Sequence, residues 1–289
     1  MLRIALPNKG RLSEDARDLF NQAGLEVRSS GERALTASLG GEFEAIFVRA
    51  QDIPEFIADG AADAGITGLD LVRESGREID EKLDCRFGRC RIVLATREDS
   101  RVRTVQDIED GARVATAFPS IAGQFFLSRG KRVTIVPVSG AAEIAPHLGI
   151  ADMIVDIVST GSTLRTNGMR EAETLMESTA RLFSSPAVGA DPASGKQAAL
   201  DELVSALESV IHARGKRYLM ANVPRDALAR VKEVLPGLNG PTVIDIMNGG
   251  IYVAVHAVVP ADSIYRTIGS LKQLGAEGIL VTRIERLMP

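Results

Sequence analysis

Aromatic residues are scarce in this 289-residue chain: tryptophan is absent, and aromatics make up 4% of the sequence. Proteins that bind single-stranded nucleic acid stack its bases on aromatic side chains interleaved with basic ones. Basic residues are not in excess either, because 34 Lys and Arg stand against 38 Asp and Glu, a formal net charge of −4. We therefore expect no nucleic-acid partner, while a local basic pocket for a phosphorylated small molecule is compatible with this balance.

Cysteine and histidine are also few. The two cysteines, Cys85 and Cys90, cannot form a disulfide framework, and their spacing is not that of a metal motif. The three histidines add too little for a structural metal site. Reduced thiols in a cytoplasmic protein are the simplest interpretation.

Long hydrophobic runs are missing. None approaches the ~20 residues that a membrane-spanning helix needs, so we expect no membrane association. The first residues, MLRIALPNK, pass directly into a strand-like stretch without a long apolar segment or a cleavage site, and we expect no secretory signal peptide. At roughly 100–200 residues per domain, the length predicts two domains or three.

Short β-branched runs alternate with helical patterns through the first half of the chain. Residues 7–12 are predicted to be a loop, followed by a helix capped by Ser13; a second unit begins near Cys90. Predicted strands are 2–6, 44–48, 62–66, 91–95, 113–116, 133–136 and 153–158, and predicted helices are 52–59, one from about 120, and 143–148. The alternation predicts α/β units with largely parallel sheets and a cleft between two lobes.

The rest of the chain has a different order. Residues 184–197, rich in Ser, Pro, Gly and Ala, are the best candidate for a linker, and a helix is predicted over 197–214. Strands at 217–223, 242–247, 251–259 and 278–285, with helices at 224–235 and 262–274, give the order β-α-β-β-α-β of a ferredoxin-like unit. Asn248-Gly-Gly is its hairpin turn. Its loops carry no catalytic cluster, which favours regulation or assembly.

The segment 156–164, with the sequence DIVSTGSTL, is the most informative. An apolar strand ends in small and hydroxylated residues just before a helical pattern resumes, and backbone N–H groups that converge there favour an anion. The pattern and lysine of a Walker loop are missing. Asp156 at the strand end suits ribose hydroxyls or a Mg²⁺ ion. The alternative is an ordinary capped strand–helix turn with a solvated aspartate.

This segment resembles the phosphoribosyl-diphosphate loop of the ATP phosphoribosyltransferases, the first enzymes of histidine biosynthesis. Four further segments match that family, in order: LPNKGRL at 6–12, GITGLD at 65–70, ATAFP at 115–119 and GAAEIAPHLGIAD at 140–152. The β-α-β-β-α-β tail looks like the regulatory domain of the family's long form. Each motif alone is weak, but five in order are specific and cover nearly the whole chain.

The resemblance implies a reaction and a fold. The family joins N1 of ATP to C1 of phosphoribosyl diphosphate and releases pyrophosphate, with Mg²⁺ required. The expected fold is a two-lobed, periplasmic-binding-protein-like α/β core followed by a ferredoxin-like domain. Residues 1–89 with 179–213 would form lobe I, residues 90–178 lobe II, and residues 214–289 the regulatory domain.

The resemblance also assigns the phosphoribosyl-diphosphate site. Asp156 would hold the ribose hydroxyls and the metal, and Glu143 would lie near the same sugar; a carboxylate placed in the first turn of a helix is the alternative for Glu143. The residues that would bind the 5-phosphate are Ser159, Thr160, Gly161, Ser162 and Thr163. No nucleophile motif such as GxSxG is present, as expected for a transfer that depends on alignment and charge stabilisation.

The resemblance places the ATP site at the ends of the first strands. Lys9 would meet phosphates and count with Asp156 and Glu143 among the catalytic residues. The remaining ATP-binding residues would be Gly10, Arg11, Arg49, Gly68 and Asp70, with Gly65, Gly68 and Asp70 in a loop near the adenine. A solvated basic loop and a simple tight turn are the alternatives.

Two positions depart from the family. Many relatives carry Lys or Arg where this chain has Gln51, and many have an Asn and a basic residue where it has Ser120 to Gln124. The loss of these cations leaves the exact triphosphate contacts of this chain open, whereas its sugar-phosphate loop is intact.

In long-form relatives the last domain binds histidine as a feedback inhibitor and helps to build a hexamer. By position, Asn222, Leu238 and Thr242 would form the histidine site, and a homo-oligomer between dimer and hexamer is expected. A strand end and an ordinary Gly-Pro turn are the alternative for these residues. Two other functions fit a two-lobed protein: a solute-binding protein, and a ligand sensor without catalysis.

Overall fold

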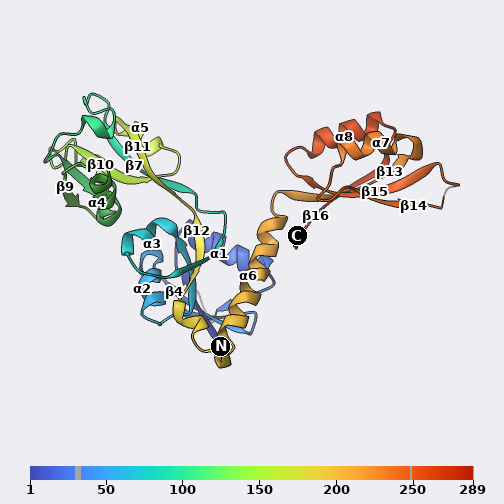
Figure 1. The fold of residues 1–289 in the computed structure, drawn as a ribbon, viewed down its shortest axis with the longest axis horizontal. Coiled ribbons are helices and arrows are strands. Elements are labelled where there is room, and N and C mark those ends of the chain that lie inside the picture. Colours follow the sequence, from blue (N-terminus) through green and yellow to red (C-terminus); the bar gives the residue numbers. More distant parts are fainter. Residues whose placement is uncertain (30–33, 248, 289) are drawn as a thin grey trace. The chain divides into compact units, whose positions relative to one another are not determined.

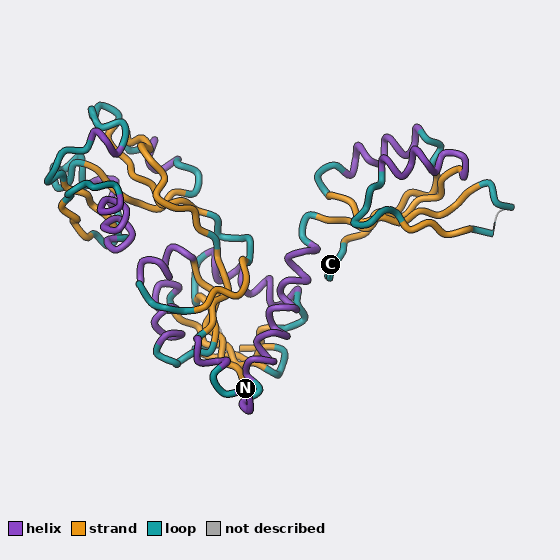
Figure 2. The backbone as a smooth tube through the Cα atoms, in the orientation of Figure 1, coloured by secondary structure: helices purple, strands orange, loops and turns teal. Residues whose placement is uncertain are grey.

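The computed structural model describes residues 1–29, 34–247 and 249–288. The chain forms two compact units, Met1–Val204 and Ser205–Pro289. Figure 1 labels their elements, and Figure 2 shows the same backbone with helices in purple and strands in orange. In the described part of the chain, no helix is both long and apolar enough to cross a membrane.

The first unit contains a seven-stranded sheet with the order β2-β3-β4-β1-β5-β12-β6, which we call lobe I together with its helices. β1 runs parallel to β4 and β5, while β12 runs antiparallel to both of its neighbours. The strands are β1 Leu2–Pro7, β2 Val27–Ser29, β3 Thr36–Leu39, β4 Phe43–Val48, β5 Ala64–Gly68, β6 Asp80–Asp84 and β12 Ala180–Ser184. The helices are α1 Arg11–Gln22, α2 Ile53–Ala58 and α3 Leu69–Ser75, with a 3₁₀ turn at Ala50–Asp52.

A five-stranded sheet with the order β11-β7-β10-β8-β9 forms the second part of this unit, which we call lobe II. β10 lies between β7, to which it is antiparallel, and β8, to which it is parallel. The strands are β7 Cys90–Arg97, β8 Arg113–Thr116, β9 Thr134–Pro137, β10 Met153–Val158 and β11 Met169–Ser178. The helices are α4 Pro119–Ser128 and α5 Ser162–Thr166, with 3₁₀ turns at Val105–Asp107 and Ala142–Ile144.

Lobe II buries both faces of its sheet. Phe118 and Phe126 pack with Leu94 and Val155 on one face, and small residues such as Ala142 pack on the other. Because most of β10 is buried between these two clusters, its residues are apolar except for Asp156, although Ile157 near its end is 46% exposed.

The second unit is a four-stranded antiparallel sheet with the order β14-β15-β13-β16. Its elements are β13 Lys216–Pro224, α7 Leu228–Val234, β14 Thr242–Asp245, β15 Tyr252–Pro260, α8 Ile264–Gln273 and β16 Glu277–Arg283. Alternate residues of β13 and β15 are buried in a cluster that includes Val231 of α7 and Leu271 of α8. The predicted β-α-β-β-α-β order is confirmed, although the Asn248 of its hairpin lies outside the described residues.

The preceding helix, α6 Lys196–Ala213, is also close to its prediction and spans the boundary between the units.

Several local predictions are wrong. Ser13 does not cap α1, because the helix begins at Arg11 after Gly10, whose φ of 77° only glycine adopts readily, and Ser13 is buried in its first turn. The helix expected over 143–148 is only the 3₁₀ turn Ala142–Ile144. The segment 184–197 is not a free linker, because Ser184 ends β12 and two 3₁₀ turns, Pro186–Gly189 and Pro192–Ser194, follow it with Val188 buried. The strands β2, β3, β6, β11 and β12 were not predicted.

Candidate active site

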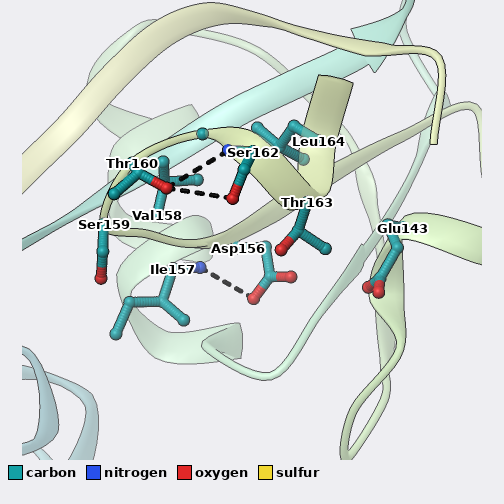
Figure 3. A pocket seen from close by; sticks show the side chains of 10 residues that line it. Glu143, Asp156, Ile157, Val158, Ser159, Thr160, Ser162, Thr163 and Leu164 are labelled. Carbon is teal, nitrogen blue, oxygen red and sulfur yellow. Dashed lines mark hydrogen bonds between the residues drawn. The ribbon is translucent and has the colours of Figure 1, made fainter. Parts of the chain in front are cut away.

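The loop between β10 and α5 lines a pocket of about 250 Å³ in lobe II (Figure 3). Gly161, with φ 75°, turns the chain into α5, whose first residue is Ser162. The pocket is lined by Glu143, Asp156, Ile157, Val158, Ser159, Thr160, Gly161, Ser162, Thr163 and Leu164. The structure thus brings together every residue that the sequence analysis assigned to the phosphoribosyl-diphosphate site.

Hydroxyl groups dominate the exposed side of this loop. The Oγ1 of Thr160 lies 3.0 Å from the Oγ of Ser162 and accepts a longer bond of 3.4 Å from the backbone N–H of Ser162. Ser159 and Thr163 are exposed beside them. Hydroxyls and the N–H groups at a helix start are donors for phosphate oxygens. Neither lysine nor arginine is among the described residues that line this pocket.

Two carboxylates reach the same pocket from different elements. Asp156 projects from β10 and Glu143 from the Ala142–Ile144 turn (Figure 3). Burial raises the pKa of Asp156, and the nearby charge of Glu143 raises it further, against a hydrogen bond of 2.7 Å from the N–H of Ile157 to its Oδ1. The ionised pair therefore favours a cation or hydroxyl donors in this pocket.

These carboxylates fit a divalent metal that is shared with a ligand. In the described part of the chain, no group of three or more His, Cys, Asp or Glu side chains could hold a metal alone. Mg²⁺ is usually bound by one or two carboxylates together with phosphate oxygens and water. Asp156 with Glu143 supplies that kind of partial donor set.

Charged residues behind the loop were missed in the sequence. Arg165 donates to the carbonyl oxygen of Thr160 across 3.3 Å, and Arg91 forms two hydrogen bonds of 2.7 and 3.1 Å with the carboxylate of Glu171. A Cβ on Gly161 would lie 3.0 Å from an Arg165 nitrogen and 3.1 Å from a Glu171 oxygen. The only signal in the sequence is the polarity of these residues, because their approach depends on pairing of β11 with β7.

A second pocket, of about 280 Å³, adjoins the first and shares Ile157 and Ser159 with it. It combines apolar side chains that suit a flat ring with arginines that suit phosphates. Its lining residues are Arg11, Leu12, Gly68, Asp70, Leu71, Gly88, Arg89, Cys90, Phe118, Ile157 and Ser159. They come from both lobes of the first unit.

The predicted ATP residues divide into two groups. Arg11, Gly68 and Asp70 line this second pocket. The other three, Lys9, Gly10 and Arg49, are exposed and are not part of its lining. Lys9 and Arg49 follow the paired ends of β1 and β4, where Pro7 is opposite Val48. The basic residues thus form a group at the carboxyl ends of parallel strands, where open α/β sheets bind ligands.

The predicted loop over Gly65, Gly68 and Asp70 is wrong. Both glycines belong to β5, which is paired with β12 up to Gly68, and Asp70 lies in the first turn of α3. Asp70 is only 5% exposed. Its Oδ1 accepts a bond of 2.5 Å from the hydroxyl of Ser178, which in turn accepts the N–H of Asp70 at 3.1 Å. Only a small part of the Asp70 carboxylate therefore faces the pocket.

The second pocket also contains residues that the sequence analysis did not assign to a ligand. Arg89 precedes β7 and Cys90 is its first residue, while Phe118, which belongs to the ATAFP segment, precedes α4. Burial, and next the charge of Asp70, raise the pKa of Cys90 to about 11, against a hydrogen bond with Ser178. The thiol stays protonated at neutral pH and acts as a small apolar wall.

The residues assigned to histidine binding are in the second unit. Asn222 lies in β13 opposite Ala254, with Glu277 on its other side, and Thr242 opens β14 opposite His256. Strand β15 separates β13 from β14, so Asn222 and Thr242 are not neighbours in the sheet. Leu238 is exposed in the segment before β14.

Comparison with known proteins identifies the family. The family model for ATP phosphoribosyltransferase matches residues 49–209, and the model for the C-terminal domain of HisG matches residues 213–286. The chain belongs to the ATP phosphoribosyltransferase family. The predicted long form, with its own C-terminal domain, is confirmed by the two adjacent matches.

Relatives within the ATP phosphoribosyltransferase family match over their full length. A Gemmatimonas aurantiaca ATP phosphoribosyltransferase is 68% identical over 292 residues, which cover all of both chains. The Natronomonas pharaonis ATP phosphoribosyltransferase is 48% identical over 289 residues, again covering both chains completely. The predicted transferase is thereby favoured over the solute-binding protein and over the sensor without catalysis.

A solved structure agrees with the two-lobed core. The ATP phosphoribosyl transferase (HisG:HisZ) complex from Thermotoga maritima matches with a TM-score of 0.62 and 27% identity. The match covers 99% of that chain but 72% of this one. The predicted fold class, an α/β two-lobed core with an additional C-terminal domain, is confirmed by this match and by the C-terminal family model.

Proposed function

We propose that the chain joins N1 of ATP to C1 of phosphoribosyl diphosphate and releases pyrophosphate, the first step of histidine biosynthesis. One observation supports this function at the level of the site. A hydroxyl-lined pocket with two carboxylates adjoins an apolar pocket with arginines, and Ile157 and Ser159 line both. Two ligands bound in adjoining pockets can present their reacting atoms to each other.

The loop pocket is proposed to bind phosphoribosyl diphosphate. Residues 159–163 would take the 5-phosphate through backbone N–H groups and hydroxyls, as their exposure in the pocket supports. Burial and the charge of Glu143 raise the pKa of Asp156, and none of the described residues that line the pocket is a lysine or arginine. Ribose hydroxyls would supply hydrogen-bond donors to this carboxylate. Glu143 would contact the same sugar from the Ala142–Ile144 turn.

The second pocket is proposed to bind ATP. The adenine ring would lie among the apolar side chains of Leu12, Leu71 and Phe118, with Gly68 and Asp70 at its edge. Arg11 lines this pocket, and the exposed side chains of Lys9 and Arg49 would contact the polyphosphate together with the backbone of Gly10. We add Arg89 to the phosphate contacts, because Gln51 and the segment 120–124 provide no cation.

The reaction requires alignment more than covalent catalysis. The N1 lone pair forms the new bond to C1 while the C1–O bond breaks, its electron pair leaves with pyrophosphate, and the adenine loses a proton from its exocyclic nitrogen. Positive charge develops on the sugar in between, and the Asp156 carboxylate, which lines the loop pocket, would stabilise that charge. Lys9 is proposed to stabilise the negative charge on the phosphates.

The family uses a divalent metal ion, which we propose is Mg²⁺. Asp156, with Glu143 nearby, would hold it together with substrate oxygens, and the ion would neutralise charge on the leaving pyrophosphate.

The remaining assignments form part of the same proposal. Residues 1–89 with 179–213 and residues 90–178 would be the two catalytic lobes, which the membership of β12 in the first sheet supports. Residues 214–289 would bind histidine at Asn222, Leu238 and Thr242 and inhibit the enzyme. Oligomeric partners are known for the Thermotoga maritima complex, and we propose a homo-oligomer, dimer to hexamer, in the cytoplasm where its substrates occur.

An absorbance assay for phosphoribosyl-ATP tests this proposal. The reaction contains ATP, phosphoribosyl diphosphate, Mg²⁺ and a pyrophosphatase, with and without histidine. Product that histidine suppresses supports both the transferase and the regulatory domain. Product insensitive to histidine removes the regulatory assignment alone, and absence of product from folded protein overturns the function.

A further inference from the structure

Helix α3 is the element of lobe I that contacts lobe II most directly. Leu71 packs against the buried cluster of lobe II that contains Phe118 and Ile121. Asp70 and Glu74 are four residues apart, so they lie on the same face of the helix. Asp70 is bonded to Ser178, the last residue of β11.

Glu74 makes the second polar connection between α3 and lobe II, at the start of α4. One carboxylate oxygen accepts the backbone N–H of Ser120 at 2.9 Å, and the other accepts the N–H of Ile121 at 3.0 Å. Both donors belong to the first turn of α4, which begins with Pro119 and has no side-chain cap of its own. The first N–H groups of a helix lack partners within it, and a carboxylate there also interacts favourably with the helix dipole.

This contact supports two walls of the second pocket. Asp70 and Leu71 line the pocket from the first turn of α3, and Phe118 lines it from the residue before α4. Glu74 therefore connects the two elements that carry these walls, without lining the pocket itself. The same contact occupies the start of α4, so ATP phosphates are not expected there. The lack of basic residues over 120–124 agrees with that expectation.

We propose that Glu74 is a positioning residue for phosphoribosyl transfer, because its carboxylate joins α3 to the start of α4 and sets the width of the ATP pocket. The inference rests on the proposed function only in naming ATP as the ligand of this pocket. A shift of about 1 Å in the position of a bound substrate can cost about a hundredfold in rate, so such a support is expected to matter.

The kinetic test compares Glu74→Gln and Glu74→Ala with Glu78→Gln, a matched exposed glutamate for which the structure gives no side-chain hydrogen bond or ion pair. We expect the KM for ATP to rise about tenfold in Glu74→Gln and more in Glu74→Ala, with the KM for phosphoribosyl diphosphate within about twofold of wild type. A purely structural role would lower the melting temperature without this separation of the two KM values. Equal kinetics in all three variants would overturn the proposal.

A distance measurement tests Glu74 without catalysis. Spin labels at Glu42→Cys in lobe I and Gln106→Cys in lobe II report the separation of the lobes, since both positions are exposed and the native Cys85 and Cys90 are buried. Glu74→Ala is expected to broaden the distance distribution, and an unchanged distribution would contradict the proposal. If wild type makes no phosphoribosyl-ATP, the proposed function fails, while the spin-label result still decides whether Glu74 joins the lobes.

Discussion

The two pockets of the first unit are built from the sequence in different ways. The pocket proposed for phosphoribosyl diphosphate comes from one continuous segment, 156–164, with Glu143 added. The pocket proposed for ATP is assembled from five separate stretches, at 11–12, 68–71, 88–90, 118 and 157–159. Phosphate can be bound by the backbone of a single loop, whereas a flat ring with a polyphosphate needs walls from several elements.

The two pockets also differ in charge. Carboxylates and hydroxyls line the first, and arginines with apolar side chains line the second. If this division reflects two substrates, variants in each pocket must affect the KM of one substrate and not the other.

The largest effect is expected for Asp156→Asn. The substitution keeps the size of the side chain but removes the charge that would stabilise the sugar, and kcat should fall on the order of 10²- to 10³-fold with the fold intact. Steady-state kinetics measures kcat, and circular dichroism tests whether the fold is intact. Asp152→Asn is the control, because that aspartate is paired with Arg113 outside the pocket and its substitution should leave kcat unchanged.

Gly161→Val tests the loop backbone. The φ of 75° strains a β-branched residue, and its side chain would meet Arg165 and Glu171, so binding of phosphoribosyl diphosphate should weaken at least tenfold. Calorimetric titration measures that binding, and the free energy of unfolding should fall by about 1–3 kcal/mol. Gly123→Ala, at a helical glycine with open space around it, should change neither binding nor the loop. Unchanged affinity in Gly161→Val would remove the loop from the site.

Arg11→Ala sharpens the contrast between the pockets. Loss of a charged phosphate contact should raise the KM for ATP about tenfold and leave the KM for phosphoribosyl diphosphate unchanged. Arg28→Ala is the control, since Arg28 is exposed in β2 and paired with Glu26. Equal increases in both KM values would show that the pockets do not bind the substrates separately.

The smallest effect is a shift in pH dependence. Burial and the charge of Glu143 raise the pKa of Asp156, so activity that needs the ionised carboxylate is lost on acidification at a higher pH than for an ordinary aspartate. Glu143→Gln removes the neighbouring negative charge and so lowers the pKa of Asp156. The pH at which kcat/KM falls on acidification, the acid limb of its profile, then moves lower. Glu109→Gln, exposed and remote from the pocket, should leave the limb in place. A limb that moves to higher pH would contradict the electrostatic account.

Local sequence was sufficient for elements with strong patterns. The strand β10 was predicted with its observed bounds because an apolar run stops abruptly at small polar residues. The helix α6 was predicted because Leu200, Leu203 and Leu207 recur at helical spacing and are buried. The family resemblance then supplied the substrates, which no residue pattern alone could name.

Elements fixed by their partners were not predictable in this way. β6 has the charged sequence DEKLD, and β11 alternates irregularly because two register shifts interrupt its pairing with β7. Gly65 and Gly68 suggested a loop, but pairing with β12, more than a hundred residues later, keeps them in a strand. The same long-range pairing decides which residues of the proposed ATP pocket meet. Arg89 lies outside the segments that match the family, and Phe118 lies in the ATAFP segment, to which no ligand was assigned.

The position of β12 has a consequence for biosynthesis of the chain. Ser178 is paired with Cys90, so lobe II begins and ends at neighbouring positions and is an insertion within lobe I. A nascent chain released up to residue 179 holds all of lobe II, while β5 and β6 still lack the strand that lies between them. We therefore expect lobe II to fold first during translation, with lobe I closing its sheet only when β12 emerges. Until then the unpaired edges of β5 and β6 are the part of the chain most exposed to misassociation.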